Sequence, residues 1–271
     1  MGLHGLALAG LLVSPNVWLP WLAIAAANLA LLGLLGMVPR NRLLGPNLVR
    51  LPKSCAQANL VALCFDDGPD PVVTLPVLDI LERHGATASF FCVGRRARQH
   101  PGIVQEIIRG GHSVENHTDR HPLGFAAFGM SGMRGEVERA QAALAGITGH
   151  APRFFRAPAG LRSPLLDPVL ARCGLRYATW TRRGHDTIRR DPGRILRRLT
   201  TGLAAGDILL LHDGSCARTH DGQPVVLAVL PDLLAEIEAR GLRAVSLPTA
   251  LAAEPAAQPS ARPLWKVLLA P

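Results

Sequence analysis

Strand-like and helix-like segments alternate along the chain from about residue 58 to about residue 250, and this alternation limits the fold more than any other feature. Helical patterns separate most of seven apolar strand-like runs, which cover residues 59–65, 86–93, 111–116, 152–157, 175–181, 206–212 and 242–247. Repeated β-then-α units place consecutive strands parallel to one another in one sheet covered by helices. We therefore predict an α/β fold with a closed or nearly closed parallel barrel. An open doubly wound sheet is the alternative, but no glycine-rich phosphate loop or dinucleotide fingerprint follows the first strand.

The N-terminal segment carries no Asp, Glu, Lys or Arg in its first 39 residues. Its longer apolar run, residues 17–38, has 22 residues. As a helix this run would be about 33 Å long, which is enough to cross a bilayer. Trp18 and Trp21 lie near one end of the run, where membrane interfaces favour aromatic side chains. We predict a membrane anchor; a buried core helix is the alternative, and a cleaved signal peptide fits less well because no Lys or Arg precedes the apolar run.

Basic residues follow this apolar run at Arg40, Arg42, Arg50 and Lys53. Because basic flanks tend to stay in the cytoplasm, we expect the folded domain on the cytoplasmic face of a bacterial-type inner (plasma) membrane. A shorter apolar run of about 11 residues at the start could be re-entrant or half of a hairpin, which would change the number of crossings. We divide the chain into an anchor with its basic flank (1–52), a folded domain that carries the chemistry (53–253) and a C-terminal tail (254–271).

The chain is basic, with 29 Lys and Arg residues, 20 Asp and Glu residues and a formal net charge of +9. A net positive charge can favour nucleic acid or an anionic surface. Aromatic residues make up only 4% of the chain, however, and no nucleic-acid motif is present, so we expect no nucleic-acid partner. The five cysteines form no framework of spacings, and Cys64 and Cys92 lie in strand-like runs, so we expect buried, reduced thiols.

Polar side chains recur where the predicted strands end, which is the end of a parallel barrel that carries function. They are Asp66 and Asp67 after the first run, His117 and His121 after the third, Arg156 after the fourth, Asp186 after the fifth and His212 after the sixth. Each alone has an ordinary explanation, such as a structural turn, a solvated histidine pair or an arginine paired with a carboxylate. Adjacent carboxylates at the end of a buried strand repel each other, however, and a bound cation would offset that cost. Together these residues predict a metal site with a base, an acid and orienting charges.

Five short motifs occur in a fixed order along the chain. They are "FDDGPD", "NHTDRHP", "RAPAG", a Trp six residues before an Asp (Trp180 and Asp186), and "LLLH". In this order they resemble the five motifs of polysaccharide deacetylases, carbohydrate esterase family 4, over roughly residues 58–250. The resemblance implies a distorted (β/α) barrel with seven or eight parallel strands. It also implies metal-dependent removal of acetyl groups from N-acetylated amino sugars, and less often from O-acetyl esters.

The resemblance implies a metal centre and a base at the end of the first strand. Asp67, His117 and His121 match the ligands of a divalent metal, most often zinc or a similar transition ion. One carboxylate and two imidazoles leave positions open for water and substrate. Asp66 matches the general base that takes a proton from the attacking water, and a nearby cation should keep it ionised.

The resemblance also implies an acid, two orienting residues and a substrate pocket. His212 matches the acid that protonates the departing sugar nitrogen, because an amine leaves poorly without that proton. Arg156 matches the residue that tethers the base, and Asp186 matches the residue that orients and charges His212. The pocket residues that we expect are Pro158, Ala159, Gly160, Trp180, Leu209 and Leu211.

Some positions differ from the family pattern. Ala159 replaces an aromatic residue that is common in the family, Thr187 replaces a frequent Trp, and Arg182 and Arg183 occupy that loop, which argues against a long groove of stacked sugars. Residues 122–133, "PLGFAAFGMSGM", follow the histidine pair and are apolar and glycine-rich. They are either a loop packed on the barrel rim or a flap that touches lipid through Phe125, Phe128, Met130 and Met133.

We therefore expect a membrane-anchored, metal-dependent hydrolase that removes the N-acetyl group from an amino-sugar glycan or a lipid-linked amino sugar. Its partners would be that glycan or glycolipid and the membrane, without nucleic acid. The alternatives are the same chemistry on peptidoglycan or a chitin-like polymer outside the membrane, deformylation of a lipid-linked sugar, and an inactive glycan-binding scaffold. An inactive member should lack a metal ligand or Asp66, and none of these residues is missing.

Overall fold

The structure of the protein is a computed structural model, and it describes residue 5 and residues 18–252. The main elements in these residues are α2 (Trp18–Gly36), α3 (Lys53–Gln57), β1 (Leu60–Asp66), α4 (Thr74–Arg83), β2 (Ser89–Cys92), α5 (Gly94–Gln99), α6 (Pro101–Arg109), β3 (Ser113–Asn116), η2 (Phe125–Ala127), α7 (Met130–Thr148), β4 (Phe154–Phe155), η3 (Pro158–Gly160), α8 (Leu166–Arg172), β5 (Arg176–Tyr177), β6 (Arg182–Arg183), α9 (Pro192–Thr200), β7 (Ile208–His212), α10 (Val225–Ala239), β8 (Arg243–Val245) and α11 (Leu247–Ala252). The short first apolar run and the tail at 254–271 lie outside the described residues.

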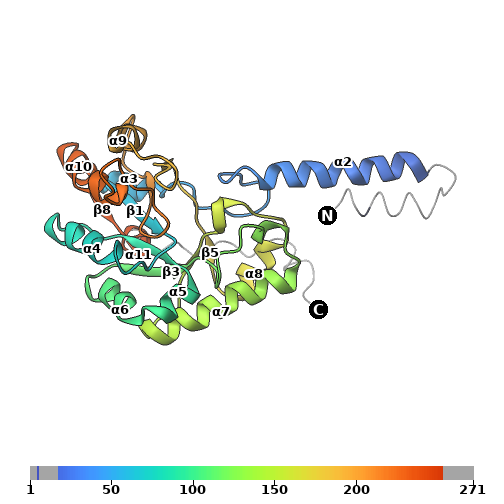
Figure 1. Ribbon diagram of the computed structural model, residues 1–271. Helices are drawn as coiled ribbons and strands as arrows, with labels where there is room; N and C mark the ends of the chain where they lie inside the picture. Colours follow the sequence, from blue (N-terminus) through green and yellow to red (C-terminus); the bar gives the residue numbers. More distant parts are fainter. Residues whose placement is uncertain (1–4, 6–17, 253–271) are drawn as a thin grey trace, which may run out of the picture.

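A curled parallel sheet forms the centre of the domain (Figure 1). Seven strands follow the order β5-β4-β3-β2-β1-β7-β6, and β8 pairs with the first residues of β1. Every strand pairing is parallel. The predicted α/β fold, a distorted barrel of about seven parallel strands, is therefore confirmed. Each of the seven strand-like runs overlaps one strand, and β6 is a further short strand that the sequence did not indicate.

The central strands β1, β2 and β7 are buried on both faces, as expected for parallel strands covered by helices. Residues 61, 63 and 65 of β1 pack in the layer between the sheet and helices α4, α6, α9 and α10. Residues 60, 62 and 64 belong to a second apolar cluster on the other, concave face, which α3 and α11 complete. Since side chains alternate along a strand, Asp66 continues the concave face. The alternation thus directs this carboxylate to the inside of the barrel.

Local sequence signals set the ends of several helices. Pro101 begins α6, where its missing N–H removes no helical hydrogen bond. Asp191 caps the start of α9, because its side chain accepts a hydrogen bond from the backbone N–H of Arg194 at 3.1 Å. Gly149 ends α7 with a left-handed φ of 75°. These caps fix where each helix returns the chain to the sheet.

The loop after the histidine pair packs against the barrel rim. Phe125 and Met133 are buried in a third apolar cluster beside β4, β5, α7 and α8, and Phe128 packs against the same cluster. The Phe125 ring lies 5.7 Å from the ring of Phe155. A flap that touches lipid through Phe125 and Met133 is therefore wrong, because these side chains fill the core instead. Leu123, at 84% exposure, and Met130, at 38%, are the large apolar side chains of this loop that stay open to solvent.

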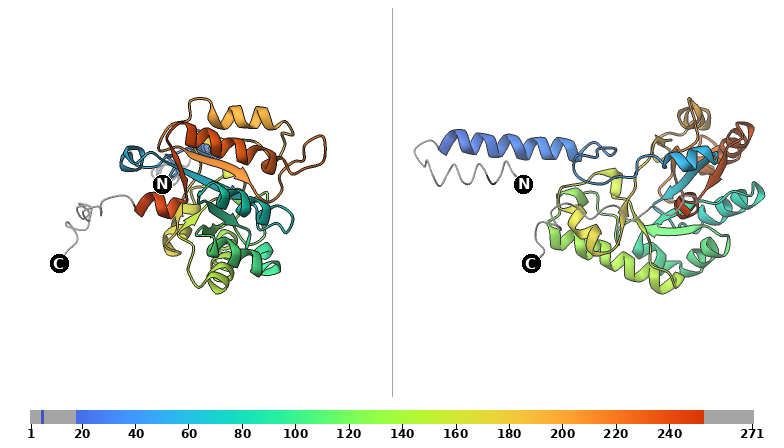
Figure 2. Two further views of the ribbon diagram at one scale, coloured as in Figure 1. Left: turned by 90° about the vertical axis from the view of Figure 1, so that its left-hand side faces the viewer. Right: turned by 180° about the vertical axis from the view of Figure 1, so that it is seen from behind.

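Helix α2 extends away from the barrel (Figures 1 and 2). Its 19 residues are apolar and mostly exposed, and its length and composition are sufficient to cross a bilayer. The end of α2 lies against the domain. The carbonyl of Gly36 accepts a hydrogen bond from the backbone N–H of Arg162 at 3.2 Å. Beyond the helix, an Nη1 atom of Arg40 donates to the carbonyl of Thr181 at 3.2 Å.

Residues 47–51, which we call the seam segment, lie along the opening between the edge strand β5 and the start of β7. The backbone N–H of Leu48 donates to the Tyr177 carbonyl, and the Leu48 carbonyl accepts from Thr179, both at 3.0 Å. The backbone N–H of Leu51 donates to the Gly206 carbonyl at 2.8 Å. The chain between the apolar helix and the first strand is therefore part of the barrel wall.

Candidate active site

One cavity of about 330 Å³ opens at the C-terminal ends of the strands. Its lining residues are Asp66, Asp67, His117, His121, Leu123, Ala159, Gly160, Trp180, Arg183, Thr187, Leu210, His212 and Ser215. The structure therefore brings together residues from five strand ends that are far apart in the sequence. This is the end of a parallel barrel where active sites are found.

Asp67, His117 and His121 converge on one point in this cavity. Their ligand atoms all lie within 4.8 Å of one another. Oδ1 of Asp67 is 3.2 Å from Nε2 of His117 and 3.1 Å from Nε2 of His121. A tetrahedral ion with bonds of about 2.0–2.1 Å separates its ligand atoms by roughly 3.3 Å, so the spacing of the three groups fits such an ion.

The hydrogen bonds of His117 support the same reading. Nδ1 of His117 lies 2.8 Å from the carbonyl oxygen of Arg156, and a carbonyl only accepts, so Nδ1 carries the proton. In the neutral imidazole, Nε2 then directs a lone pair toward the Asp67 carboxylate. Two lone pairs facing each other are unfavourable unless a proton or a cation lies between them. The donor set therefore fits a divalent metal held by one carboxylate and two imidazoles.

The Asp67 carboxylate is held in its charged form. Burial alone would raise the pKa of Asp67, but the imidazoles of His117 and His121 beside the carboxylate outweigh burial and lower the pKa well below its usual range. A carboxylate that stays ionised is a suitable metal ligand at any physiological pH.

Several residues that line the cavity have left-handed backbone conformations, which residues other than glycine rarely adopt. They are Asp67 (φ 75°), His121 (φ 57°), Ala159 (φ 54°) and Ser215 (φ 58°). Each such residue costs of order 1–3 kcal/mol, and this cost persists where the surrounding structure holds the backbone. The concentration at one cavity marks the functional end of the barrel.

Arg156 fixes Asp66, the first aspartate of the pair. The Arg156 side chain is fully buried, and Nη1 donates to Oδ1 of Asp66 at 2.6 Å. Its Nε and Nη2 atoms donate to the carbonyls of Ala178 and Thr179 at 3.1 and 2.9 Å, and the guanidinium lies 3.9 Å from the centre of the Phe91 ring. With one oxygen of Asp66 occupied by Arg156, the other, Oδ2, lies 4.0 Å from Nε2 of His117 and faces the cavity.

His212 lies beside Asp66 on the neighbouring strand β7, and a buried carboxylate holds its ring. Nδ1 of His212 is 2.8 Å from Oδ1 of Asp186, and Oδ2 of Asp186 accepts from the backbone N–H of His212 at 2.7 Å. Burial lowers the pKa of His212, but the charge and hydrogen bond of Asp186 outweigh burial, so the pKa is raised. This imidazole can therefore hold a proton on Nε2 near neutral pH and present it to the cavity.

The cavity contains part of the predicted pocket wall. Ala159, Gly160 and Trp180 line the cavity, whereas Pro158 is buried beside it. The assignment of Leu209 and Leu211 to the wall is wrong, because both pack in the outer layer against the helices. Leu210 lines the cavity instead. The reason is the strand alternation, which puts residues 208, 210 and 212 on one face of β7.

The structure adds two residues that the sequence reasoning did not use. Nη1 of Arg96 donates to the backbone carbonyl of Asp67 at 2.8 Å and so holds the turn that carries the metal ligand. Asp213 is buried beneath the same turn, where it accepts from Oγ1 of Thr74 at 2.7 Å. Burial, together with the charges of Asp67 and Asp66, raises the pKa of Asp213 to about 7. Asp213 directly follows His212 in the sequence, and this adjacency could have indicated that Asp213 lies near the site.

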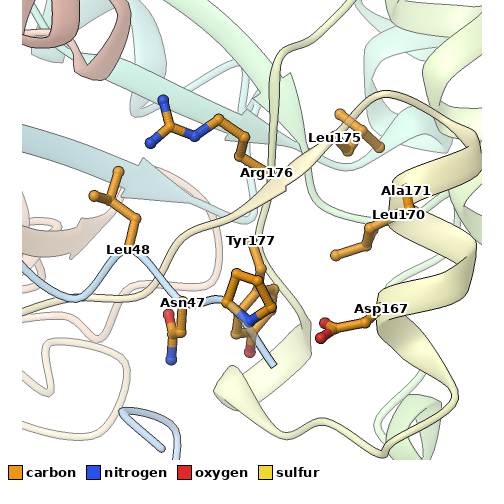
Figure 3. A pocket seen from close by; sticks show the side chains of 9 residues that line it. Asn47, Leu48, Asp167, Leu170, Ala171, Leu175, Arg176 and Tyr177 are labelled. Atoms are coloured by element: carbon orange, nitrogen blue, oxygen red, sulfur yellow. The ribbon is translucent and has the colours of Figure 1, made fainter. Parts of the chain in front are cut away.

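A second cavity of about 460 Å³ lies outside the barrel beside α8 (Figure 3). Its lining includes two charged side chains, and both have partners. Asp167 forms an ion pair with Arg162, and the guanidinium of Arg176 lies 5.6 Å from the centre of the Phe154 ring. This cavity contains none of the residues that the motifs singled out.

The parallel barrel, with a candidate metal centre, a buried carboxylate and a buried histidine at its functional end, defines a barrel hydrolase. Residues 53–178 match the profile of the polysaccharide deacetylase family. The chain belongs to this family, carbohydrate esterase family 4, and is a hydrolase that acts on amide bonds.

Relatives in this family cover most of the folded domain. A chitooligosaccharide deacetylase from Sinorhizobium fredii is 33% identical over 204 residues, which are 73% of this chain and 94% of the relative. A peptidoglycan-N-acetylglucosamine deacetylase from Bacillus cereus is 28% identical over 190 residues, 69% of this chain and 86% of the relative. The crystal structure of a family 4 pseudoenzyme from Bacillus anthracis shares the fold, with a TM-score of 0.67, 18% identity, and coverage of 76% of this chain and 68% of that one.

Proposed function

We propose that this protein is a membrane-anchored, metal-dependent N-deacetylase of an amino sugar. One observation carries the proposal: the three candidate ligands meet within 4.8 Å of one another in the cavity that also contains Asp66 and His212. A base and an acid beside a metal centre are what amide hydrolysis needs.

The chain's own residues would divide the reaction as follows. A divalent metal held by Asp67, His117 and His121, with Zn²⁺ favoured by this ligand set, would supply Lewis-acid polarisation of the amide carbonyl. Asp66, held by Arg156, would accept a proton from the attacking water. His212, charged and oriented by Asp186, donates a proton to the nitrogen as the C–N bond breaks, so that acetate and a free amine leave.

The cavity is suited to one amino-sugar unit. Its volume of about 330 Å³ is at the lower end of the range for small-molecule sites. The Trp180 side chain offers an aromatic wall for a sugar ring, and Leu210 offers an apolar contact for an acetyl methyl group. Relatives named as deacetylases of chitooligosaccharide and of peptidoglycan N-acetylglucosamine support an N-acetylated glycan as the substrate.

The membrane part of the proposal depends on α2. Nearly all of this apolar helix is exposed, and exposed apolar area costs roughly 25 cal/mol per Å², which a bilayer would remove. The chain leaves α2 next to the active site, because a Cβ atom added to Gly160 would lie 2.8 Å from Cβ of Pro39. An anchor that ends beside the cavity wall favours a substrate close to the membrane surface.

The proposal is tested by metal removal and product analysis on the purified full chain. Chelation should abolish release of acetate from a chitooligosaccharide, and added zinc or cobalt should restore it. His117→Ala should lose the metal, whereas Asp66→Asn should keep the metal and lower turnover by about 10²–10⁴-fold. Full activity in Asp66→Asn would remove the assigned base. A wild-type protein that binds metal and glycan without releasing acetate or formate would instead be a glycan-binding scaffold.

A further inference from the structure

Arg183 is a cation of the active-site cavity without an ion-pair partner among the described residues. In the sheet, Arg183 lies opposite Leu210, and both residues line the cavity. Its guanidinium lies 5.1 Å from the centre of the Trp180 ring. Its Nε atom is buried without a hydrogen-bond partner, and no acidic side chain in the described part of the chain pairs with it.

Arg182, the preceding residue of β6, is an arginine whose contacts are structural, and it provides a comparison for Arg183. Arg182 lies opposite Leu209, so it faces the other way. Its Nε donates to Oδ2 of Asp207 at 2.6 Å, and its other nitrogens donate to the carbonyls of Thr201 and Gly202. Arg182 is thus fully used in holding the fold. Arg183 has no such partners, and the sheet directs it at the place where the substrate binds.

More unpaired guanidinium groups continue from Arg183 across the surface. A hollow of about 760 Å³ is lined by Arg189, Arg194, Arg197, Arg198 and Thr201. Of these four arginines, only Arg194 forms an ion pair, at 3.3 Å with Asp191, within residues 18–252. The Nε atom of Arg189 is buried and also lacks a partner.

The two sites are joined by the residues between them. A Cβ atom added to Gly184 would meet Ile195 and Leu199 of α9 at 2.9 and 3.6 Å, so the residue after Arg183 touches the helix that carries the arginines. Burial and the charges of Arg183, Arg198 and Arg189 lower the pKa of His185. All three guanidinium groups are therefore close enough to His185 to repel a proton on its ring. Positive charge therefore continues from Arg183 in the cavity to Arg189 and Arg198 at the hollow, and we call these cations the track.

The position of this track argues against a role in holding the membrane. Helix α9 lies at the end of the domain away from α2 in Figure 1 and in the view from behind in Figure 2. If α2 crosses a bilayer, these arginines are not placed next to its headgroups. An anion for Arg183 would then come from the substrate rather than from the headgroups around α2.

We propose that the substrate carries a phosphate next to the amino sugar, that Arg183 binds this phosphate, and that the arginines of α9 attract it. This inference rests on the proposed deacetylase function and specifies its substrate. The planar guanidinium matches two phosphate oxygens at once, and a phosphate brings up to two negative charges to a track in which, among the described residues, only Arg194 forms an ion pair. The phosphate could belong to a soluble sugar phosphate or to a lipid-linked sugar.

The test compares N-acetylglucosamine with N-acetylglucosamine 1-phosphate on the metal-loaded full chain, by calorimetric binding and by acetate release. We expect the phosphate to bind at least about ten-fold more tightly, as typical hydrogen bonds to charged groups would give. Arg183→Gln should remove most of that preference and Arg183→Lys should retain part of it. Arg190→Gln, which removes an exposed arginine that lines neither cavity, should retain the preference and is the matched control.

The outcomes separate the two proposals. Equal affinity of the wild type for both sugars, or an unchanged preference in Arg183→Gln, would overturn the phosphate site even if deacetylation is observed. A preference that depends on Arg183, without acetate release from any sugar, would keep the phosphate site and overturn the deacetylase. A detergent-solubilised lipid-linked N-acetylglucosamine diphosphate distinguishes the sources: a higher kcat/KM than for the soluble phosphate, lost in Arg183→Gln, identifies the lipid form.

Discussion

Asp186→Asn should change the pH dependence of the reaction without removing the metal. In the structure, Asp186 is fully buried and holds His212 by two contacts, 2.8 Å to Nδ1 and 2.7 Å to the backbone N–H. The asparagine keeps the size of the side chain but loses its charge. It can still accept one of the two hydrogen bonds, so the fold should be retained.

The expected shift follows from the sign of the interaction. Asp186 raises the pKa of His212, and the proposed acid works only when His212 is protonated, so activity should be lost as pH rises through that pKa. A hydrogen bond to a charged group contributes roughly 1.5–3 kcal/mol, which corresponds to about 1–2 pH units. Loss of the Asp186 charge should therefore move the alkaline limb of the kcat profile to lower pH by about this amount, and kcat should fall by about 10²–10⁴-fold.

Acetate release measured between pH 5 and pH 10, together with metal content at each pH, checks this prediction. The wild type and the variant should contain the same amount of metal, because Asp186 contacts the imidazole and not the three candidate ligands. An alkaline limb that stays in place would show that His212 is not the acid. Loss of metal in the variant would show that Asp186 belongs to the metal site.

Three further predictions concern stability and membrane orientation. Arg156→Met should lower the free energy of unfolding by about 3–5 kcal/mol in denaturant titrations because it leaves the Asp66 carboxylate buried and unpaired; a loss below 1 kcal/mol would contradict this. Phe125→Ala should lower the free energy of unfolding by about 3–5 kcal/mol, whereas Leu123→Ala, at an exposed position, should change it by less than about 0.5 kcal/mol. Equal effects of the two substitutions would place both side chains on the surface. A phosphatase fused after Pro271 should be inactive in cells if the domain faces the cytoplasm, and an active fusion would reverse the proposed orientation.

The barrel could be predicted from the sequence because parallel strands buried on both faces give continuous apolar runs between helical patterns. The run at 206–212 shows this well: its burial is complete from Ile208 to His212. A continuous apolar run does not, however, show toward which face of the sheet each side chain points. In an all-apolar run nothing marks which alternate residues face the cavity, so Leu209 and Leu211 were assigned to the wall that Leu210 forms.

The sequence was sufficient to predict which residues belong to the candidate site, but it was not sufficient to predict the contacts that hold them in place. The motifs singled out the histidines and carboxylates, and the structure brings them into one cavity. The rest depended on tertiary contacts between segments that are far apart in the sequence. The strand at Arg182–Arg183 has no apolar pattern and exists only through its pairing with β7, and Phe125 is buried because α7 and β4 happen to meet there.

Because the seam segment is part of the barrel wall, a shortened chain without the apolar helix must still contain residues 47–51. Similarity to the family begins at residue 53, but a chain that starts there would lose the backbone hydrogen bonds of Leu48 and Leu51 and the pair between Arg50 and Asp207. The unpaired edge of β5 would then be open to strands of other molecules, and such edges promote aggregation. A shortened chain that begins near Pro39 should be monodisperse, whereas one that begins at residue 53 should precipitate.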